Sequence, residues 1–443
     1  MAGKQKISAD LILSRARFVI TCDANATIFT NASVVVTAGQ IAAVGPAGEI
    51  ENLYRADQTI DVSDQLIMPG LVNLHTHTPM TLLRGVAENV DLQGFLEIVW
   101  DKEDRVMNPD GVYVGARLGA LECLLGGTTT TLDMYLHPLE THRGAAEVGL
   151  RHVIGPVFFD FPGPEKLTWS QRLEQAQTWP EQVREITGPY VPLALMPHAP
   201  LTVNPEHLAQ IAAIAQESGS LVTTHASENI TENEDTQKKY NATPTELLEQ
   251  AGILKHRTVL GHGVHLSSTD RTTIARRGTS IAHCPGSNMK LASGAADIVG
   301  YRAQGINVGL GTDGCSSSND LDMFSVMRLS ANLARLVRND PASISAAEII
   351  KAATVDGARA LGIDDRVGTI ETGKEADLIT LDLDVPHMVP MRDPHTAVVF
   401  SAGRGDVRHV LVAGDLVIKD HQSTRVAANS VFTAANEHLA KYF

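Results

Sequence analysis

The chain has few cysteines, and none lies in a pair typical of a disulfide framework or a thiolate metal site. Cys22, Cys123, Cys284 and Cys315 are far apart in the 443 residues, and no Cys-x-x-Cys motif occurs. The four cysteines are therefore interpreted as small buried residues. A metal site in this protein would need other ligands.

Long apolar runs and an excess of positive charge are also missing. No run of 18 apolar residues occurs and residues 1–6 lack the apolar segment of a secretory signal, so we expect a cytoplasmic protein. The formal net charge of -15 argues against nucleic acid or an anionic membrane as a partner, because phosphate surfaces would repel the protein. Glycine patches such as Gly126-Gly127 match no dinucleotide or phosphate loop. A small neutral or cationic molecule is the expected partner.

What the chain does contain is a repeated strand and helix pattern. With 43% hydrophobic and 20% charged residues, it can bury a large core and form more than one domain. Short β-branched runs ending in polar residues alternate with helical patterns, such as the one that Asn204-Pro205 opens. Eight runs can be counted: 68–77, 128–133, 153–159, 193–198, 221–225, 258–262, 280–284 and 308–313. This pattern predicts an α/β fold, a (β/α)8 barrel of TIM type with its active site at the C-terminal strand ends.

Short alternating strands with turn signals lie on both sides of the barrel. Residues 33–45 and 407–419 have the pattern of β-hairpins. Two small β pieces are each too small to be stable alone, and they can bury their faces against each other. We therefore predict a β-sandwich from both termini, with residues 1–66 and 376–443 as its two parts and 67–375 as a metal-dependent barrel.

Two histidines end the first predicted strand. In Met68-Pro-Gly-Leu-Val-Asn-Leu-His75-Thr-His77 they are two residues apart, so both imidazoles can reach one point beyond the strand end. The pair alone is a weak signal among 17 histidines. However, His225 ends the fifth strand and Asp313 the eighth, and structural roles do not explain this joint placement. Three neutral nitrogens and a carboxylate suit zinc, and iron would also accept them, so one divalent metal is predicted.

These residues predict a hydrolytic reaction. A divalent metal lowers the pKa of its bound water toward ~7, and the resulting hydroxide could attack a ring carbon that bears an amino group. Asp313 could accept the proton, and Glu228, three residues beyond His225, could protonate a ring nitrogen. His262, at the end of the sixth strand, would hydrogen-bond the water or the developing alkoxide. The alternative roles are structural: Glu228 could stabilise a helix N-terminus, and His262 could be an ordinary strand-end residue.

Several motifs resemble the amidohydrolase superfamily, and the likeness spans nearly the whole chain. They are residues 68–77, His225-Ala-Ser-Glu228, Gly261-His-Gly-Val-His265, residues 287–291, Gly311-Thr-Asp-Gly314 and residues 373–378. Residues 77–85, 103–105, 133–135 and 197–200 further resemble the methylthioadenosine/S-adenosylhomocysteine deaminase branch, which is related to chlorohydrolases and guanine deaminases. The resemblance implies a barrel with a split sandwich, one divalent metal and hydrolytic release of ammonia from an aromatic amine.

The same resemblance implies two substrate contacts. It places His198 near the heterocycle and Glu103 near a ribose or another polar tail. Without it, Glu103 in Asp101-Lys-Glu-Asp-Arg105 would be interpreted as part of a solvated helix face.

The resemblance to this branch fails in one segment, and this segment affects which substrate is expected. Members of the branch that act on adenosylhomocysteine have arginines at and after the third strand, where this chain has Gly155-Pro-Val-Phe-Phe-Asp-Phe-Pro162. An apolar, proline-bent loop lacks the guanidinium groups that would bind a carboxylate, so a carboxylated tail is disfavoured. Methylthioadenosine is the favoured substrate, while another deoxyadenosine, another aminated heterocycle or an s-triazine-like compound stay open.

Three functions are therefore considered. The first is a metal-dependent hydrolytic deaminase of an aminated N-heteroaromatic compound. The second is a hydrolase of the same fold that cuts an s-triazine C–Cl or C–N-alkyl bond, a urea or a carbamate. The third, a non-catalytic scaffold, is disfavoured because all the ligands and the proton shuttle are present.

One metal is favoured over two, because the fourth strand ends in His198 with no lysine nearby to bridge a pair of ions. The Pro-Cys-x-x-Cys signature of the cysteine-ligated zinc deaminases is absent. We also expect a homodimer or homotetramer, as is common in such families.

Overall fold

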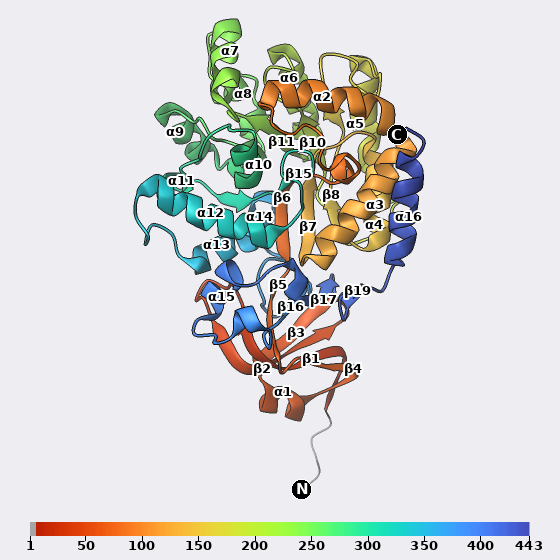
Figure 1. Ribbon diagram of the computed structural model, residues 1–443, viewed down its shortest axis with the longest axis vertical. Coiled ribbons are helices and arrows are strands. Elements are labelled where there is room, and N and C mark those ends of the chain that lie inside the picture. The colour runs from red at the N-terminus through yellow and green to blue at the C-terminus, as the bar shows by residue number, and fades with distance from the viewer. Residues whose placement is uncertain (1–5, 443) are drawn as a thin grey trace.

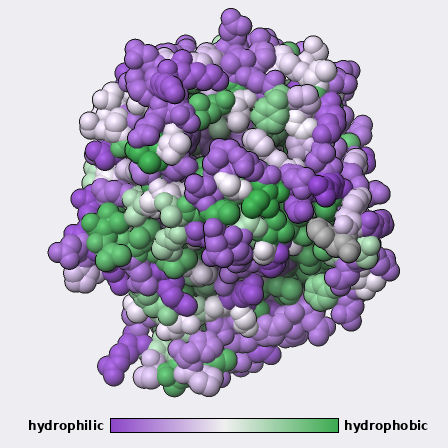
Figure 2. Space-filling model, turned by 45° about the horizontal axis from the view of Figure 1, so that its top comes forward, coloured by the Kyte–Doolittle hydropathy of each residue, from purple (hydrophilic) through white to green (hydrophobic). Residues whose placement is uncertain are grey.

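The computed structural model of the protein describes residues 6–442. Figure 1 shows two stacked parts: a β-rich part that contains strands from both ends of the chain, and a larger α/β part above it. Most of the face in Figure 2 is hydrophilic and is interrupted by separate hydrophobic patches. The apolar residues of the alternating pattern thus lie mainly inside the molecule.

Strands from both termini form one nine-stranded sheet (Figure 1). β5 (Gln65–Pro69) lies within it, parallel to β1 (Ile7–Ile20) and antiparallel to β16 (Leu378–Asp382). The other strands are β2 (Ile28–Thr37), β3 (Gln40–Pro46), β4 (Tyr54–Asp61), β17 (Val407–Val412), β18 (Asp415–Lys419) and β19 (Gln422–Ser423). Leu13 and Leu411 belong to the same buried apolar cluster, so the two ends of the chain share a core.

The two predicted hairpins are both present, and their turns touch. Ala38-Gly39 joins β2 to β3, and Ala413-Gly414 joins β17 to β18. All four residues have positive φ, between 49° and 83°, as two-residue hairpin turns of this kind require. A Cβ on Gly414 would lie 2.4 Å from the Cα of Gly39, so only glycine fits at this contact.

The central strands pair in parallel in two ladders, in the orders β15-β6-β7-β8 and β14-β13-β12-β11-β10-β9. Their bounds are β6 (Leu71–His77), β7 (Thr128–Asp133), β8 (Arg151–Val153), β9 (Val157–Phe158), β10 (Ala194–Pro197), β11 (Leu221–Ala226), β12 (Thr258–His262), β13 (Ser280–His283), β14 (Val308–Leu310) and β15 (Asp313–Gly314). Each ladder ends where a single predicted strand is split, into β8 and β9 or into β14 and β15.

The split between β8 and β9 has a local cause. Pro156 has no N–H to donate to a ladder, and a Cβ on the preceding Gly155 would lie 1.8 Å from the carbonyl oxygen of Ala194. The backbone of β10 therefore approaches this stretch too closely for any other residue at position 155.

Helices follow most of these strands and surround them in Figure 1, whereas α1 lies against the β-rich part. They are α1 (Ala47–Leu53), α2 (Leu92–Val106), α3 (Pro109–Leu125), α4 (Pro138–Val148), α5 (Trp169–Arg184), α6 (Pro205–Ser218), α7 (Ile230–Tyr240), α8 (Pro244–Gln250), α9 (Ser268–Arg277), α10 (Pro285–Lys290), α11 (Ile298–Ala303), α12 (Met323–Arg338), α13 (Ala346–Ala352), α14 (Val355–Leu361), α15 (Pro394–Phe400) and α16 (Ala428–Leu439). As predicted, α6 opens after Asn204, whose side chain accepts a hydrogen bond from the N–H of His207. Among residues 6–442, no helix combines the length and the apolar character needed to cross a membrane.

Candidate active site

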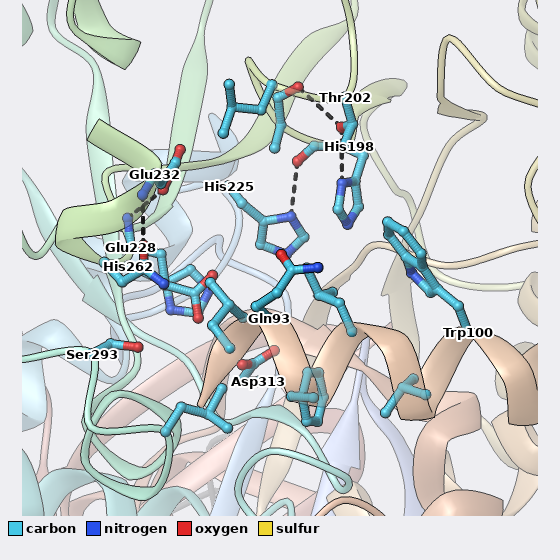
Figure 3. Close-up of a pocket in the computed structure, with 18 of the residues that line it drawn as sticks. Gln93, Trp100, His198, Thr202, His225, Glu228, Glu232, His262, Ser293 and Asp313 are labelled. Carbon is cyan, nitrogen blue, oxygen red and sulfur yellow. Dashed lines mark hydrogen bonds and ion pairs between the residues drawn. The ribbon is translucent and has the colours of Figure 1, made fainter. Parts of the chain in front are cut away.

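The ends of the parallel strands bring the four predicted metal ligands together. His75 and His77 end β6, His225 lies in β11 and Asp313 begins β15. Direct pairing sets their positions, because Asp313 lies opposite Thr76 across β15 and β6. Figure 3 shows His225 and Asp313 around the same cavity, with His262 from β12 beside them. All five side chains are buried.

The potential ligand atoms of these residues form two groups of three that share His75. The potential ligand atoms of His75, His77 and Asp313 all lie within 4.8 Å of one another, and so do those of His75, His225 and His262. Nε2 of His77 is 3.1 Å from Oδ1 of Asp313, and Nε2 of His75 is 3.6 Å from the same oxygen. Among the described residues, neither ring nitrogen of the buried His75 has a hydrogen-bond partner. Burying such a nitrogen is costly, and coordination to a metal would compensate for it.

Backbone carbonyls hold the outer nitrogens of two of these histidines. Nδ1 of His77 donates to the carbonyl of Met134 at 2.6 Å, and Nδ1 of His225 donates to that of His198 at 2.8 Å. These bonds favour the tautomer that leaves Nε2 free to bind a metal. His262 is held similarly, because its Nδ1 lies 3.0 Å from Oδ1 of Asn288.

The protonation states also suit metal binding. Burial lowers the pKa of His75 and of His225 well below the usual value, so both imidazoles are neutral at neutral pH. Burial alone would raise the pKa of Asp313, but the hydrogen bond and charge of His77 outweigh it and hold this pKa well below its usual value. Burial would lower the pKa of His77, but the hydrogen bond and charge of Asp313 raise it to about 9, so a metal that binds this imidazole would displace a proton.

Two of the site residues have an uncommon backbone conformation. The φ angles of His262 and Asp313 are 70° and 62°, in the left-handed region that residues other than glycine seldom adopt. Such strain persists only where the surrounding structure enforces it, and it is often found at functional sites.

Glu228 lies beside the histidine group, between β11 and α7. Its Oε2 is 3.7 Å from Nε2 of His262. Burial raises the pKa of Glu228 to about 7, so the carboxyl group can exist in both protonation states near neutral pH. The backbone N–H of Glu228 donates to Oε2 of Glu232 at 2.7 Å, a contact that was not predicted from the sequence.

The two residues expected near the substrate, His198 and Glu103, line the same cavity. His198 follows β10, and its Nδ1 is 3.0 Å from the hydroxyl of Thr202. Glu103 lies on α2 and accepts a hydrogen bond of 2.7 Å from the hydroxyl of Tyr135. Burial raises the pKa of Glu103 to about 7. The interpretation of Glu103 as part of a solvated helix face is therefore wrong.

A cavity of about 440 Å³ joins all these groups. Phe159, from the loop that the sequence singled out for substrate choice, lines it. Many other lining residues were not predicted: Gln93, Phe95, Leu96, Val99, Trp100, Tyr135, Thr202, Asn229, Glu232 and Ser293. Figure 3 shows Gln93 and Trp100 on α2, on the side of the cavity that faces His225 and His198. The helical spacing of Leu92, Leu96, Val99 and Glu103 was a signal for this face of α2.

Comparisons with known proteins agree with this geometry. The model of the amidohydrolase family matches residues 66–417. The 5-methylthioadenosine/S-adenosylhomocysteine deaminase of Syntrophobacter fumaroxidans is 38% identical over 414 residues, 94% of each chain. The 5'-deoxyadenosine deaminase of Methanothermobacter thermautotrophicus is 38% identical over 366 residues, 82% of this chain and 84% of that protein.

A solved structure is similar over almost the full length. An adenosine deaminase from Xanthomonas campestris with bound zinc has a TM-score of 0.95 and 34% sequence identity, and the match covers 99% of both chains. The family model and the full-length relatives thus agree with the motifs at the strand ends. The chain belongs to the amidohydrolase family.

Proposed function

We propose that the protein is a metal-dependent hydrolytic deaminase that acts on an aminated N-heteroaromatic compound of the adenosine type. The main observation is that Glu228, a carboxyl group that can give and take protons near neutral pH, lies at the edge of a buried histidine and aspartate group. The three similar proteins described above are named as deaminases of adenosine or its derivatives, and this supports the substrate class.

His75, His77, His225 and Asp313 would hold one divalent ion. Three nitrogens and one carboxylate suit zinc, which the similar Xanthomonas campestris structure contains, and iron is the alternative. When bound, the ion lowers the pKa of water toward ~7 and so supplies a nucleophile at neutral pH.

The protein's own side chains move the protons. Asp313 accepts the proton that the attacking water loses, and protonated Glu228 donates to the ring nitrogen next to the carbon under attack. The bond from this carbon to the amino group then breaks, and ammonia leaves with the proton that Asp313 took from water. The remaining hydroxyl proton passes to Glu228 as the carbonyl of the product forms, which restores both carboxyl groups to their starting states. His262 hydrogen-bonds the oxygen that becomes the carbonyl of the product. The overall change is one water consumed and one ammonia released.

His198 and Glu103 would position the substrate. Burial lowers the pKa of His198 to about 3, so its imidazole is neutral and can hydrogen-bond a neutral heterocycle. Glu103, which lines the same cavity, would accept hydrogen bonds from sugar hydroxyls. The carbonyl of His198 also holds Nδ1 of His225, so this residue links the reacting end to the binding end.

We further propose that the two ladders form one closed eight-stranded barrel within residues 67–375. The continuity of β8 with β9 and of β14 with β15 supports closure. Residues 1–66 and 376–443 would form the β-sandwich, which their shared apolar cluster supports. A homodimer or homotetramer and a cytoplasmic location stay predictions from the sequence.

The test is ammonia release from a panel of adenosines, guanine, pterins, s-triazines and phenylureas, with other leaving groups recorded in parallel. The variant Glu228→Gln keeps the shape of the side chain but cannot shuttle protons, so we expect kcat to fall by about a thousandfold with an unchanged metal content. Glu234→Gln, at an exposed position of α7, is the control and should behave as the wild type.

Two outcomes would contradict the proposal. If no aminated ring releases ammonia, the protein is not a deaminase. If Glu228→Gln loses the metal, Glu228 is a ligand and its assigned role is wrong.

A further inference from the structure

Asp133, at the end of β7, is a buried carboxylate that the proposed reaction does not use. Its side chain has no exposed surface, and it is not among the residues that line the cavity. Burying a carboxylate is costly unless hydrogen bonds compensate for the lost water. The donors around Asp133 therefore indicate what this residue holds in place.

Two residues donate hydrogen bonds to the carboxylate of Asp133. The N–H of Thr78 donates to Oδ1 at 3.2 Å, and the Thr78 hydroxyl donates to Oδ2. Nε2 of His152, on the neighbouring strand β8, donates to the same Oδ2 at 2.8 Å. Both oxygens of Asp133 thus accept hydrogen bonds from buried donors, and a carboxylate can only accept.

The residues held in this way adjoin a metal ligand. Thr78 directly follows His77 in the chain, and Met134 directly follows Asp133. The carbonyl of Met134 accepts a hydrogen bond of 2.6 Å from Nδ1 of His77, and its N–H donates to the carbonyl of Thr76 at 3.0 Å. Two consecutive residues at the end of β7 therefore hold three consecutive residues at the end of β6, the strand beside it in Figure 1.

Helix α3 confines the turn that follows His77. A Cβ on Gly119 would lie 2.6 Å from the carbonyl oxygen of Thr78, and a Cβ on Gly115 would lie 2.6 Å from that of Pro79. The two glycines allow the helix backbone to approach the turn this closely. The donors of Thr78 therefore cannot reach other partners without moving the turn, and His77 with it.

His152 is itself held at its other ring nitrogen. Its Nδ1 lies 3.2 Å from Nδ1 of His142 on α4, and the two rings are stacked with their centroids 5.5 Å apart. Because Nε2 of His152 donates to Asp133, its Nδ1 is the acceptor in the neutral ring, and His142 is the donor. Both imidazoles are buried, so a chain of buried contacts runs from α4 through Asp133 to Thr78.

We propose that Asp133, held by His152, is a positioning residue that fixes His77 in the orientation that binds the metal. This inference rests on the proposed function, in which His77 is one of four ligands. Asp133 does not line the cavity, and it acts through the chain at Thr78 and Met134. Groups that orient metal ligands in this way commonly change metal affinity by about 10-fold to 100-fold when they are replaced.

The first test replaces the carboxylate with an amide of the same shape. In Asp133→Asn, one of the two acceptor oxygens becomes an NH2 group, which then faces a donor of Thr78 or His152. We expect the zinc dissociation constant, measured by competition with a chelator, to rise by about 10-fold to 100-fold. The visible absorption spectrum of the cobalt-loaded protein should also change, because it reports the geometry of the ligands around the ion.

Substitutions at Thr78 test the same contact from the donor side. Thr78→Val keeps the shape of the side chain but removes the hydroxyl donor, so the zinc dissociation constant should rise by about tenfold and the cobalt spectrum should change. Thr78→Ser keeps the hydroxyl and should bind zinc within about twofold of the wild type.

Thr141→Val is the matched control. Thr141 is as buried as Thr78, and its hydroxyl donates to the carbonyl of Leu136 at 2.8 Å. The substitution therefore also removes a buried hydrogen bond, but not one that holds the turn after His77. We expect a lower melting temperature, with zinc binding and the cobalt spectrum as in the wild type.

The outcomes separate this inference from the proposed function. If the wild type binds neither zinc nor cobalt, or releases no ammonia from any adenosine, the proposed function fails and this inference fails with it. If the wild type is an active metal enzyme but Asp133→Asn and Thr78→Val bind zinc and cobalt as it does, only the positioning role is overturned, even where these variants are less stable.

Two further results decide the role of Asp133. A change of the cobalt spectrum in Thr141→Val as large as that in Thr78→Val would overturn the proposal, because any lost buried hydrogen bond would then have the same effect. If Asp133→Asn does not fold, the difference between Thr78→Val and Thr78→Ser in zinc binding supports or overturns the proposal by itself.

Discussion

The two ends of the cavity are built in different ways. At one end, His75, His77, His225 and Asp313 lie at the ends of paired strands, and backbone carbonyls hold two of their rings. At the other end, Trp100 comes from helix α2 and Phe159 from the loop after β9. The strand ends have their positions fixed by neighbouring strands, whereas the helix and loop can vary in sequence without disturbing the ladder.

This difference suggests that the two ends of the cavity have different functions. The strand ends supply a reaction that many substrates can share, and the helix and loop decide which substrates fit. Changes at the first end should affect every substrate equally, while changes on α2 or the loop after β9 should affect different substrates to different extents.

The largest effect should come from His75. Changing His75 to Leu removes a ligand that belongs to both metal-binding groups, so turnover of adenosine and 5′-methylthioadenosine should fall equally, by more than ~1,000-fold, with loss of bound metal. Metal analysis together with ammonia release measures both.

The same variant gives a second readout in protein stripped of metal. Because both ring nitrogens of His75 are buried without partners, leucine should leave the melting temperature of the stripped protein unchanged or higher. A clear fall would mean that His75 has a structural role.

A smaller effect is expected for Asn288, which contacts His262. Asn288→Ala removes the acceptor that orients His262, and we expect kcat to fall about 10-fold to 100-fold for adenosine and 5′-methylthioadenosine alike. Steady-state kinetics on the two substrates test this. A loss confined to one substrate would break the distinction between the two ends.

The last effect concerns stability rather than turnover, and it arises at neither end. His142 on α4 is buried, and its Nδ1 lies 3.2 Å from Nδ1 of His152, whose Nε2 is 2.8 Å from Asp133. Burial lowers the pKa of His142 to about 3, so below pH 6.5 the unfolded chain binds a proton that the folded protein does not. The free energy of unfolding should therefore fall as the pH drops from 6.5 toward 3, by on the order of 3 kcal/mol from this residue.

Urea unfolding of metal-stripped protein at several pH values measures this effect. His142→Gln should lose some stability at pH 7 but depend less steeply on pH between 6.5 and 4 than the wild type. An unchanged slope would show that the acid sensitivity comes from other buried histidines.

The sequence was sufficient for the strands and for one end of the cavity. Buried parallel strands appear in a sequence as short apolar runs. The residue at the end of each run lies at the C-terminal ends of the strands, so His75, His225 and Asp313 could be predicted to lie close together. The splits in the third and eighth strands were missed. Their cause at Gly155 is a close approach of Ala194, a contact between segments that no local pattern contains.

The contribution of α2 to the cavity could not be predicted for a different reason. Leu96, Val99 and Trp100 have the spacing of an ordinary amphipathic helix, which indicates burial but not whether the buried face meets the core or a cavity. Similarly, Arg172 looks like a free cation in the sequence, and only its contact with Glu165 removes it from the set of substrate-binding groups.

The shared sheet has a consequence for how the protein is made. β5 pairs with β16, and the turn at Gly39 rests on Gly414, so residues near the start of the chain need partners that are translated more than 300 residues later. Until then, the edge of β5 that pairs with β16 is free and can pair with other chains. Synthesis that stops before residue 378 would release a chain whose first strands cannot complete their sheet.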